Sequence, residues 1–293
     1  MRIGFVGLGA MGLPMAQHLV AAGHEVAGFD LNAAALSTFA ADGGRVAASP
    51  ADAAKGAELL VLMVVNADQA EQVLFEAGAA DALAADGAVI LCSTCSPPRV
   101  QAMATRLALS QRGLVDAPVS GGVVGAQSGA LTVMASAPDP LYARTEEVLR
   151  TMGSRLFRVG DAPGQGAMVK TINQLLCGVH IATAAEALSL AERAGLDLPQ
   201  LLEIFGESAA SSWMLNNRGP RMAADDGKVT SAVDIFVKDL GIVLEAGRGA
   251  KAPTPLAALA QQMFLAASAQ GLGRADDSQV IEAYRGLVSS RRD

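Results

Sequence analysis

The stretch Arg2-Ile-Gly-Phe-Val-Gly7-Leu-Gly9-Ala-Met-Gly12 joins a short apolar run to a helical pattern that extends from Pro14 to Ala22. A strand, then G-x-G-x-x-G, then a helix is the arrangement of a dinucleotide site. The first glycine permits a tight turn, the second lets the backbone approach a pyrophosphate, and the third lets helix and strand pack closely. Amides at the helix N-terminus would donate to the phosphates. The stretch therefore predicts a nucleotide-binding turn.

A carboxylate follows the second apolar run at the place where such a site needs one. The run Glu25–Phe29 ends at Asp30, 18 residues after Gly12. A carboxylate there accepts hydrogen bonds from the adenosine ribose hydroxyls. A 2′-phosphate at ~4 Å would meet a like charge, at a cost of ~1–4 kcal/mol. Because no arginine follows until Arg45, we expect NAD rather than NADP.

The first half of the chain alternates apolar runs with helical patterns, which is typical of a parallel sheet with crossover helices. Seven runs are predicted as strands: Ile3–Val6, Glu25–Phe29, Leu59–Val65, Ala88–Leu91, Leu114–Asp116, Leu131–Ala135 and Leu156–Val159. Four segments are predicted as helices: Pro14–Ala22, Ala33–Ala41, Asp68–Ala77 and Pro98–Leu109. The first half is thus predicted to be a doubly wound α/β domain of Rossmann type.

After Gly160 the strand pattern stops and only helical periodicity remains. The turn-rich Asp161-Ala162-Pro163-Gly164 places the boundary between a dinucleotide-binding domain, 1–162, and an all-helical domain, 163–293. A long helix is predicted from Gly166 to Ala194. Its apolar residues cover nearly every face, so we expect it to be surrounded by protein and to pack against a second copy of the chain.

Composition excludes several classes of protein. Lys+Arg 22 against Asp+Glu 29 gives a net charge of −7 without a basic cluster, so neither nucleic acid nor an anionic membrane is an expected partner. Three cysteines cannot form a disulfide framework and indicate a reducing, cytoplasmic location. Cys92 and Cys95 form a C-x-x-C, for which a redox role is the minor alternative. No His, Cys, Asp and Glu spacing predicts a metal site.

Two further stretches carry polar groups suited to chemistry. In Asp116-Ala-Pro-Val-Ser120-Gly121-Gly122, a hydroxyl and backbone amides could bind a carboxylate, although an ordinary tight turn would read the same way. Lys170 and Asn173 lie three apart among apolar neighbours. A lysine in such surroundings is either paired structurally or kept for proton transfer, and burial would lower its pKa towards neutrality.

Four ordered blocks together resemble the β-hydroxyacid dehydrogenase family, which is related to 3-hydroxyisobutyrate dehydrogenase. The blocks are Gly7–Ala16, Asp116–Gly122, Gly164–Asn173 and Lys238-Asp239-Leu240. The resemblance covers essentially the whole chain. It implies an enzyme that transfers a hydride between NAD and a small hydroxy acid or sugar acid. One position departs from the family pattern, since Gln174 stands where an asparagine is usual.

The resemblance also implies roles for individual residues. Lys170 is expected to be the catalytic acid and base. The substrate is expected to contact Ser120, Gly121, Gly122, Asn173 and Lys238. The cofactor is expected to contact Gly7, Gly9, Ala10, Met11, Gly12, Asp30, Asn32, Val65, Asn66, Thr94 and Lys238. Without the family, Lys238 and Asp239 would be read as an exposed charged pair.

Within the family, several stretches are most similar to the branch that oxidises L-threonate, a four-carbon sugar acid, at C2. They are Val64–Asp68, Ile172–Ile181, Ser211–Met214 and Ser231–Leu240. The alternatives are 3-hydroxyisobutyrate oxidation, reduction of tartronate or succinic semialdehyde, imine reduction, and a non-catalytic NAD(H)-binding protein of the same fold. Lys170 argues against the last two. A homodimer or homotetramer is expected.

Overall fold

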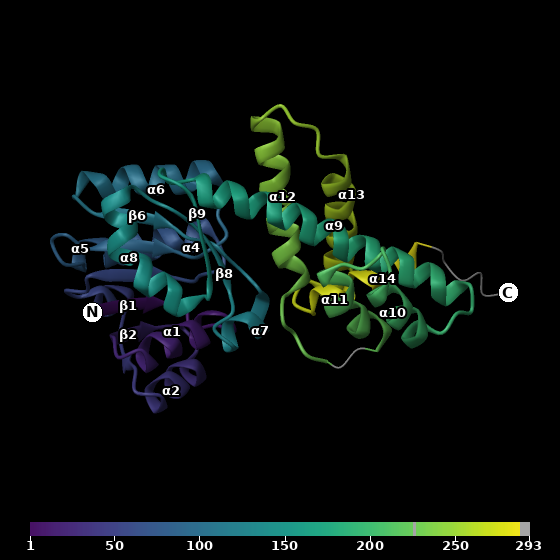
Figure 1. Cartoon of the computed structure of the whole chain (residues 1–293), viewed down its shortest axis with the longest axis horizontal. Helices are drawn as coiled ribbons and strands as arrows, with labels where there is room; N and C mark the ends of the chain where they lie inside the picture. The colour runs from purple at the N-terminus through teal and green to yellow at the C-terminus, as the bar shows by residue number, and fades with distance from the viewer. Residues whose placement is uncertain (225–226, 288–293) are drawn as a thin grey trace. The chain divides into compact units, whose positions relative to one another are not determined.

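The computed structural model describes residues 1–224 and 227–287. The chain divides into two compact units, Met1–Lys170 and Thr171–Asp293. This division lies within a single long helix, α9 (Gln165–Arg193), which matches the predicted helix within one residue at each end (Figure 1).

The strands of the first unit form a nine-stranded sheet with the order β3-β2-β1-β4-β5-β6-β8-β7, and β9 pairs with β8. The strands from β3 to β6 in this order are mutually parallel, whereas β8 is antiparallel to β6. The bounds are β1 Arg2–Val6, β2 Glu25–Phe29, β3 Arg45–Val46, β4 Leu59–Leu62, β5 Ala88–Leu91, β6 Gly113–Asp116, β7 Val119–Ser120, β8 Thr132–Ser136 and β9 Arg155–Gly160. The predicted α/β class is confirmed.

Helices cover both faces of this sheet, because alternate residues of each buried strand point to opposite faces. Leu59 and Val61 of β4 join the core cluster under α1, α2 and α8, whereas Leu60 and Leu62 join the cluster under α3 to α6. Figure 1 shows α1 and α2 on the side of the strands opposite α6. The helices are α1 Gly12–Ala21, α2 Ala33–Ala41, α3 Pro50–Ala54, α4 Ala67–Glu71, η1 Gln72–Glu76, α5 Ala79–Ala82, α6 Pro97–Leu109, α7 Gly122–Gln127 and α8 Asp139–Met152.

Several details of the first unit differ from the prediction. The strand expected over Leu59–Val65 ends at Leu62, and the helix expected over Asp68–Ala77 is α4 followed by the π-helical turn η1. The prediction also lacks the short elements β3, β7, α3, α5 and α7 and the longer helix α8. This helix buries one face through Thr145, Val148, Leu149 and Met152, a helical spacing that was present in the sequence.

The named elements of the second unit's described residues are all helices, as predicted. Its core lies between helices, with the Phe236 and Phe264 rings of α12 and α13 stacked at 5.1 Å. Beyond α9, its helices are α10 Leu198–Glu207, α11 Trp213–Ala223, α12 Val233–Gly249, α13 Pro255–Ala267, η2 Ser268–Leu272, η3 Asp277–Val280 and α14 Ile281–Gly286. Among the described segments, α9 is long and apolar enough to cross a bilayer, but 56% of its most apolar window is buried within the protein. Core helices of soluble proteins have the same properties.

Candidate active site

The predicted cofactor residues follow the carboxyl ends of parallel strands. Gly7 follows β1, Asp30 follows β2, Val65 follows β4 and Thr94 follows β5. These strands are parallel neighbours, so their carboxyl ends share one edge of the sheet. The strand order reverses between β1 and β4, and ligands of open α/β sheets bind outside the strand ends at such a switch point.

The glycine turn has the close contacts that its sequence requires. Gly7 has a φ of +97°, and a Cβ there would lie 2.4 Å from the Met63 carbonyl oxygen. A Cβ on Gly12 would lie 1.8 Å from the Gly7 carbonyl oxygen. A Cβ on Gly9 would instead meet nothing within 4 Å. The middle glycine thus faces open space next to the N-terminus of α1, as the predicted approach of a pyrophosphate requires.

Asp30 is held in place by the backbone around the glycine turn. Its Oδ2 accepts a hydrogen bond from the N–H of Leu8 at 2.6 Å, and its Oδ1 accepts one from the N–H of Asn32 at 2.7 Å. Asn32 in turn caps α2 by accepting from the N–H of Ala34. Asp30 is partly exposed. The carboxylate is therefore fixed next to the turn with oxygen lone pairs available for ribose hydroxyls.

The segment after β4 is braced by local hydrogen bonds. The Asn66 side chain caps α4 by accepting from the N–H of Gln69 at 2.9 Å, and Gln69 Oε1 accepts from the N–H of Val65. The Ser93 hydroxyl accepts from the N–H of Val64 at 2.9 Å. Val65 itself is 51% exposed. The structure thus places Val65 at the sheet edge as an exposed apolar side chain and gives Asn66 a structural role as a helix cap.

The Ser120 loop has a backbone that only glycine adopts readily. Ser120 ends β7, and Gly121 and Gly122 follow with φ values of +134° and +62°. A Cβ on Gly121 would lie 3.1 Å from the Leu131 side chain, whereas Gly122 has nothing within 4 Å. Ser120 is partly exposed. The loop therefore presents a hydroxyl beside unobstructed backbone, as a carboxylate site requires.

Lys170 lies in the second turn of α9, which is held against the ends of β6 and β8. The lysine is only 7% exposed. Just before it, the carboxylate of Asp116, the last residue of β6, accepts hydrogen bonds from the N–H groups of Gly164 and Ala167. Burial raises the pKa of Asp116 to about 6. No role of its own was predicted for Asp116 from the sequence, although it stands at the head of the glycine-rich motif.

The predicted residues of the second unit lie on α9 and α12. Asn173 has a buried Oδ1 without a hydrogen-bond partner among the described residues, which suits a group that binds a substrate hydroxyl. Gln174 Nε2 donates to Asp239 Oδ2 at 2.6 Å, and Lys238 Nζ lies 2.9 Å from Asp239 Oδ1. Asp239 is only 2% exposed. Interpreting Lys238 and Asp239 as an exposed charged pair is therefore wrong.

The cysteine pair does not have the surroundings of a redox site. Cys92 and Cys95 are both buried. Burial raises the pKa of the Cys92 thiol to about 12, and the nearby charge of Asp116 adds to the shift. Since the thiolate is the reactive form, Cys92 is packed as a small apolar residue.

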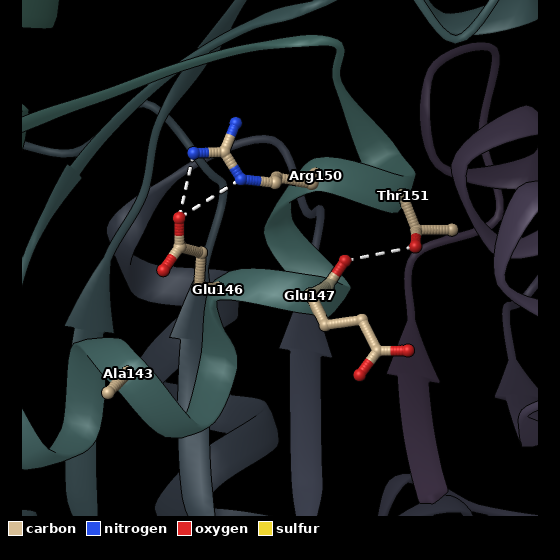
Figure 2. Close-up of a pocket in the computed structure, with 5 residues that line it drawn as sticks. All are labelled: Ala143, Glu146, Glu147, Arg150 and Thr151. Atoms are coloured by element: carbon tan, nitrogen blue, oxygen red, sulfur yellow. Dashed lines mark hydrogen bonds and ion pairs between the residues drawn. The ribbon is translucent and has the colours of Figure 1, made fainter.

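One hollow of the first unit lies away from these residues. It has a volume of about 530 Å³ and is lined by Ala143, Glu146, Glu147, Arg150 and Thr151 of α8. Figure 2 shows the Glu146 carboxylate paired with the Arg150 guanidinium there. These charged groups neutralise each other, and none of the predicted site residues lines the hollow.

Two family models together match most of the chain. Residues 2–160 match the NAD-binding domain of 6-phosphogluconate dehydrogenase, and residues 164–284 match the NAD-binding region of NADP-dependent 3-hydroxyisobutyrate dehydrogenase. The two matches meet close to the start of α9.

Individual relatives agree over nearly their full lengths. L-threonate dehydrogenase of Cupriavidus necator is 46% identical over 287 residues, which is 98% of this chain and 97% of the relative. The enzyme of the same name from Escherichia coli K12 is 43% identical, and the match covers 98% of this chain and 96% of the relative. A crystal structure of 3-hydroxyisobutyrate dehydrogenase from Salmonella typhimurium is 43% identical, with a TM-score of 0.91 over 96% of this chain and 98% of that one. The chain therefore belongs to the β-hydroxyacid dehydrogenase family and is an oxidoreductase that acts on a CH–OH group with a nicotinamide dinucleotide.

Proposed function

We propose that this protein oxidises L-threonate at C2 with NAD, and that Lys170 is the acid and base of the reaction. The observation that carries the proposal is a lysine only 7% exposed in the second turn of α9. Burying an ammonium is costly unless the group serves an interaction or a reaction. A lysine that serves as an acid and base must sit where its amine can reach the reacting hydroxyl, and α9 gives Lys170 a fixed starting point.

Each proposed residue has a separate task. Neutral Lys170 takes the proton from the C2 hydroxyl as the alcohol becomes a ketone, and protonated Lys170 returns it in the reverse direction. Ser120, Gly121 and Gly122 bind the substrate carboxylate through the hydroxyl and the backbone. Asn173 and Lys238 keep the substrate-binding roles that the resemblance implies, and Lys238 also keeps its implied cofactor-binding role. When bound, the cofactor accepts the hydride that leaves C2.

The cofactor preference follows from Asp30. Its carboxylate is fixed by the amides of Leu8 and Asn32 and would repel the 2′-phosphate of NADP by ~1–4 kcal/mol. We expect kcat/KM to be at least about tenfold higher with NAD than with NADP. Asp30→Ser should narrow the ratio, because it removes the charge. A wild-type enzyme that uses both cofactors equally would contradict this assignment.

The substrate proposal rests on the relatives, since several named L-threonate dehydrogenases are 40–46% identical over almost the whole chain. The second candidate is 3-hydroxyisobutyrate, because the similar Salmonella structure carries that name. The test is NAD⁺ reduction with L-threonate, D-erythronate, D-glycerate, 3-hydroxyisobutyrate and 3-hydroxypropionate. The highest kcat/KM is expected with L-threonate. A clear preference for 3-hydroxyisobutyrate would favour the second candidate.

The role of Lys170 is tested with Lys170→Ala. General acid–base catalysis contributes about 10²–10⁴-fold, so kcat should fall by at least about 100-fold while the Kd for NADH changes little. Lys55→Ala is the matched control, because Lys55 is an exposed lysine of the same unit. Near-normal turnover by Lys170→Ala would refute the assignment.

We also propose that the protein works as a homodimer or homotetramer in the cytoplasm. One face of α9 supports the oligomer, since Val169, Ile172, Leu176 and Leu190 are 36–69% exposed. An apolar stripe of this length is typical of a helix that packs against another subunit.

A further inference from the structure

The carboxylate of Asp116 joins the sheet to the start of α9. Its Oδ2 accepts hydrogen bonds from the N–H of Gly164 at 2.9 Å, from the N–H of Ala167 at 2.8 Å and from the Ser136 hydroxyl at 3.3 Å. The Ser136 oxygen accepts a hydrogen bond from the N–H of Gly166 at 3.0 Å. Three backbone amides around the first turn of α9 thus donate hydrogen bonds to the side chains of Asp116 and Ser136, which end β6 and β8.

The backbones at this junction approach so closely that Gly166 has no room for a side chain. A Cβ on Gly166 would lie 2.6 Å from the Met134 carbonyl oxygen and 2.7 Å from that of Asp116. Asp116 is 1% exposed and Ser136 is fully buried. Water therefore does not compete for these hydrogen bonds, which hold the first turn of α9 against the sheet.

We propose that Asp116, with Ser136, is a positioning residue that fixes both the place and the protonation of Lys170. This inference rests on the proposed role of Lys170. Lys170 follows Ala167 by three residues, a rise of ~4.5 Å along the helix. The position of the first turn of α9 on the sheet therefore determines the position of the Lys170 Cα. A displacement of about 1 Å at a reacting group costs on the order of 100-fold in rate.

The charge of Asp116 acts on Lys170 through the helix N-terminus. The first turn of a helix carries positive partial charge, which disfavours a nearby ammonium, and the Asp116 carboxylate opposes that field. Asp116 interacts with Ser136, with amides of α9 and with the Cys92 thiol. Cys92 is neutral, because burial raises its pKa to about 12. Above pH 7, Asp116 therefore carries a negative charge at this end of α9, since its own pKa is about 6.

The experiment compares Asp116→Asn, Asp116→Ala and Ser136→Ala in the full-length enzyme, with Asp81→Asn, an exposed carboxylate of the same unit, as the control. Asparagine can accept the same two amides through Oδ1 but carries no charge. We expect Asp116→Ala to lower kcat by about 30-fold or more. Its KM for NAD should stay within about threefold of the wild-type value. Asp116→Asn should keep most of kcat and move the pH of half-maximal oxidation down by about half a unit or more.

A second measurement does not depend on turnover. The rate of acylation of Lys170 by acetic anhydride, followed by mass spectrometry over pH, reports its protonation directly. The midpoint should move to lower pH in Asp116→Asn and stay unchanged in Asp81→Asn. If Asp116→Ala does not fold, the variants Asp116→Asn and Ser136→Ala test the inference in its place. Wild-type kcat and an unchanged acylation midpoint in both of these variants would overturn the inference.

The two proposals can fail separately. Absence of hydroxy-acid oxidation by the wild-type enzyme, or full activity of Lys170→Ala, would remove the proposed function. The acylation midpoint would still judge whether Asp116 controls the protonation of Lys170. Conversely, loss of activity in Lys170→Ala together with unaffected Asp116 variants would leave the proposed function standing without the positioning role.

Discussion

At the scale of single residues, alanine substitutions at Gly9 and Gly12 are expected to affect NADH binding and folding differently. A Cβ on Gly9 meets nothing within 4 Å, whereas one on Gly12 would lie 1.8 Å from the Gly7 oxygen. Gly9→Ala should therefore leave the denaturation midpoint nearly unchanged and raise the Kd for NADH by about tenfold or more, because the methyl group fills the space for the pyrophosphate. Gly12→Ala should lower both stability and NADH affinity.

Gly249 is the matched control for the glycine series, since a Cβ there also meets nothing within 4 Å and it lies at the end of α12. Gly249→Ala should change neither property. NADH binding is measured by fluorescence titration. Unchanged affinity in Gly9→Ala would mean that the pyrophosphate does not approach this turn.

At the scale of elements, the junction of β6 with α9 makes stability depend on pH. Burial raises the pKa of Asp116 from 3.8 to about 6 in the folded protein, so folding favours the protonated carboxyl. This contribution is complete below about pH 4 and is lost as the pH rises through 6, by at most about 3 kcal/mol. The excess stability of wild type over Asp116→Asn should therefore decrease between pH 4 and 7 in urea denaturation of the first unit. If the difference in unfolding free energy between wild type and Asp116→Asn stayed constant from pH 4 to 7, the raised pKa of Asp116 would be contradicted.

At the scale of the whole molecule, the uncovered face of α9 predicts association. Val169, Ile172, Leu176, His180, Thr183, Ala187 and Leu190 are exposed at a spacing of three or four residues along one face. Sedimentation should give a mass that is a multiple of 29.8 kDa. The double substitution Ile172→Glu and Leu176→Glu should reduce it to the monomer, because it places two charges on each copy of the apolar face.

Leu109→Glu is the control for association, since Leu109 is 84% exposed at the end of α6. It should leave the sedimentation unchanged. A monomeric wild-type protein would refute the oligomer, and an unaffected double variant would place the interface elsewhere.

The sequence alone determined the features that depend on neighbouring residues: the strand, glycine turn and helix around Gly7, the strand β2 before Asp30, and the helix that carries Lys170. Their spacing and backbone requirements are local, so pattern and chemistry predict them. Pattern alone did not predict α8, although its buried residues have a helical spacing in the sequence. Whether the roles of the site residues are correct stays a prediction.

Only the tertiary structure decided the contacts that hold the site residues. Asp116 lies 51 residues from Ala167, and Gln174 lies 65 residues from Asp239. No local pattern selects these partners. Each polar group is removed from water by packing and must then be paired by whichever donor or acceptor the fold brings next to it, because an unpaired buried group is costly.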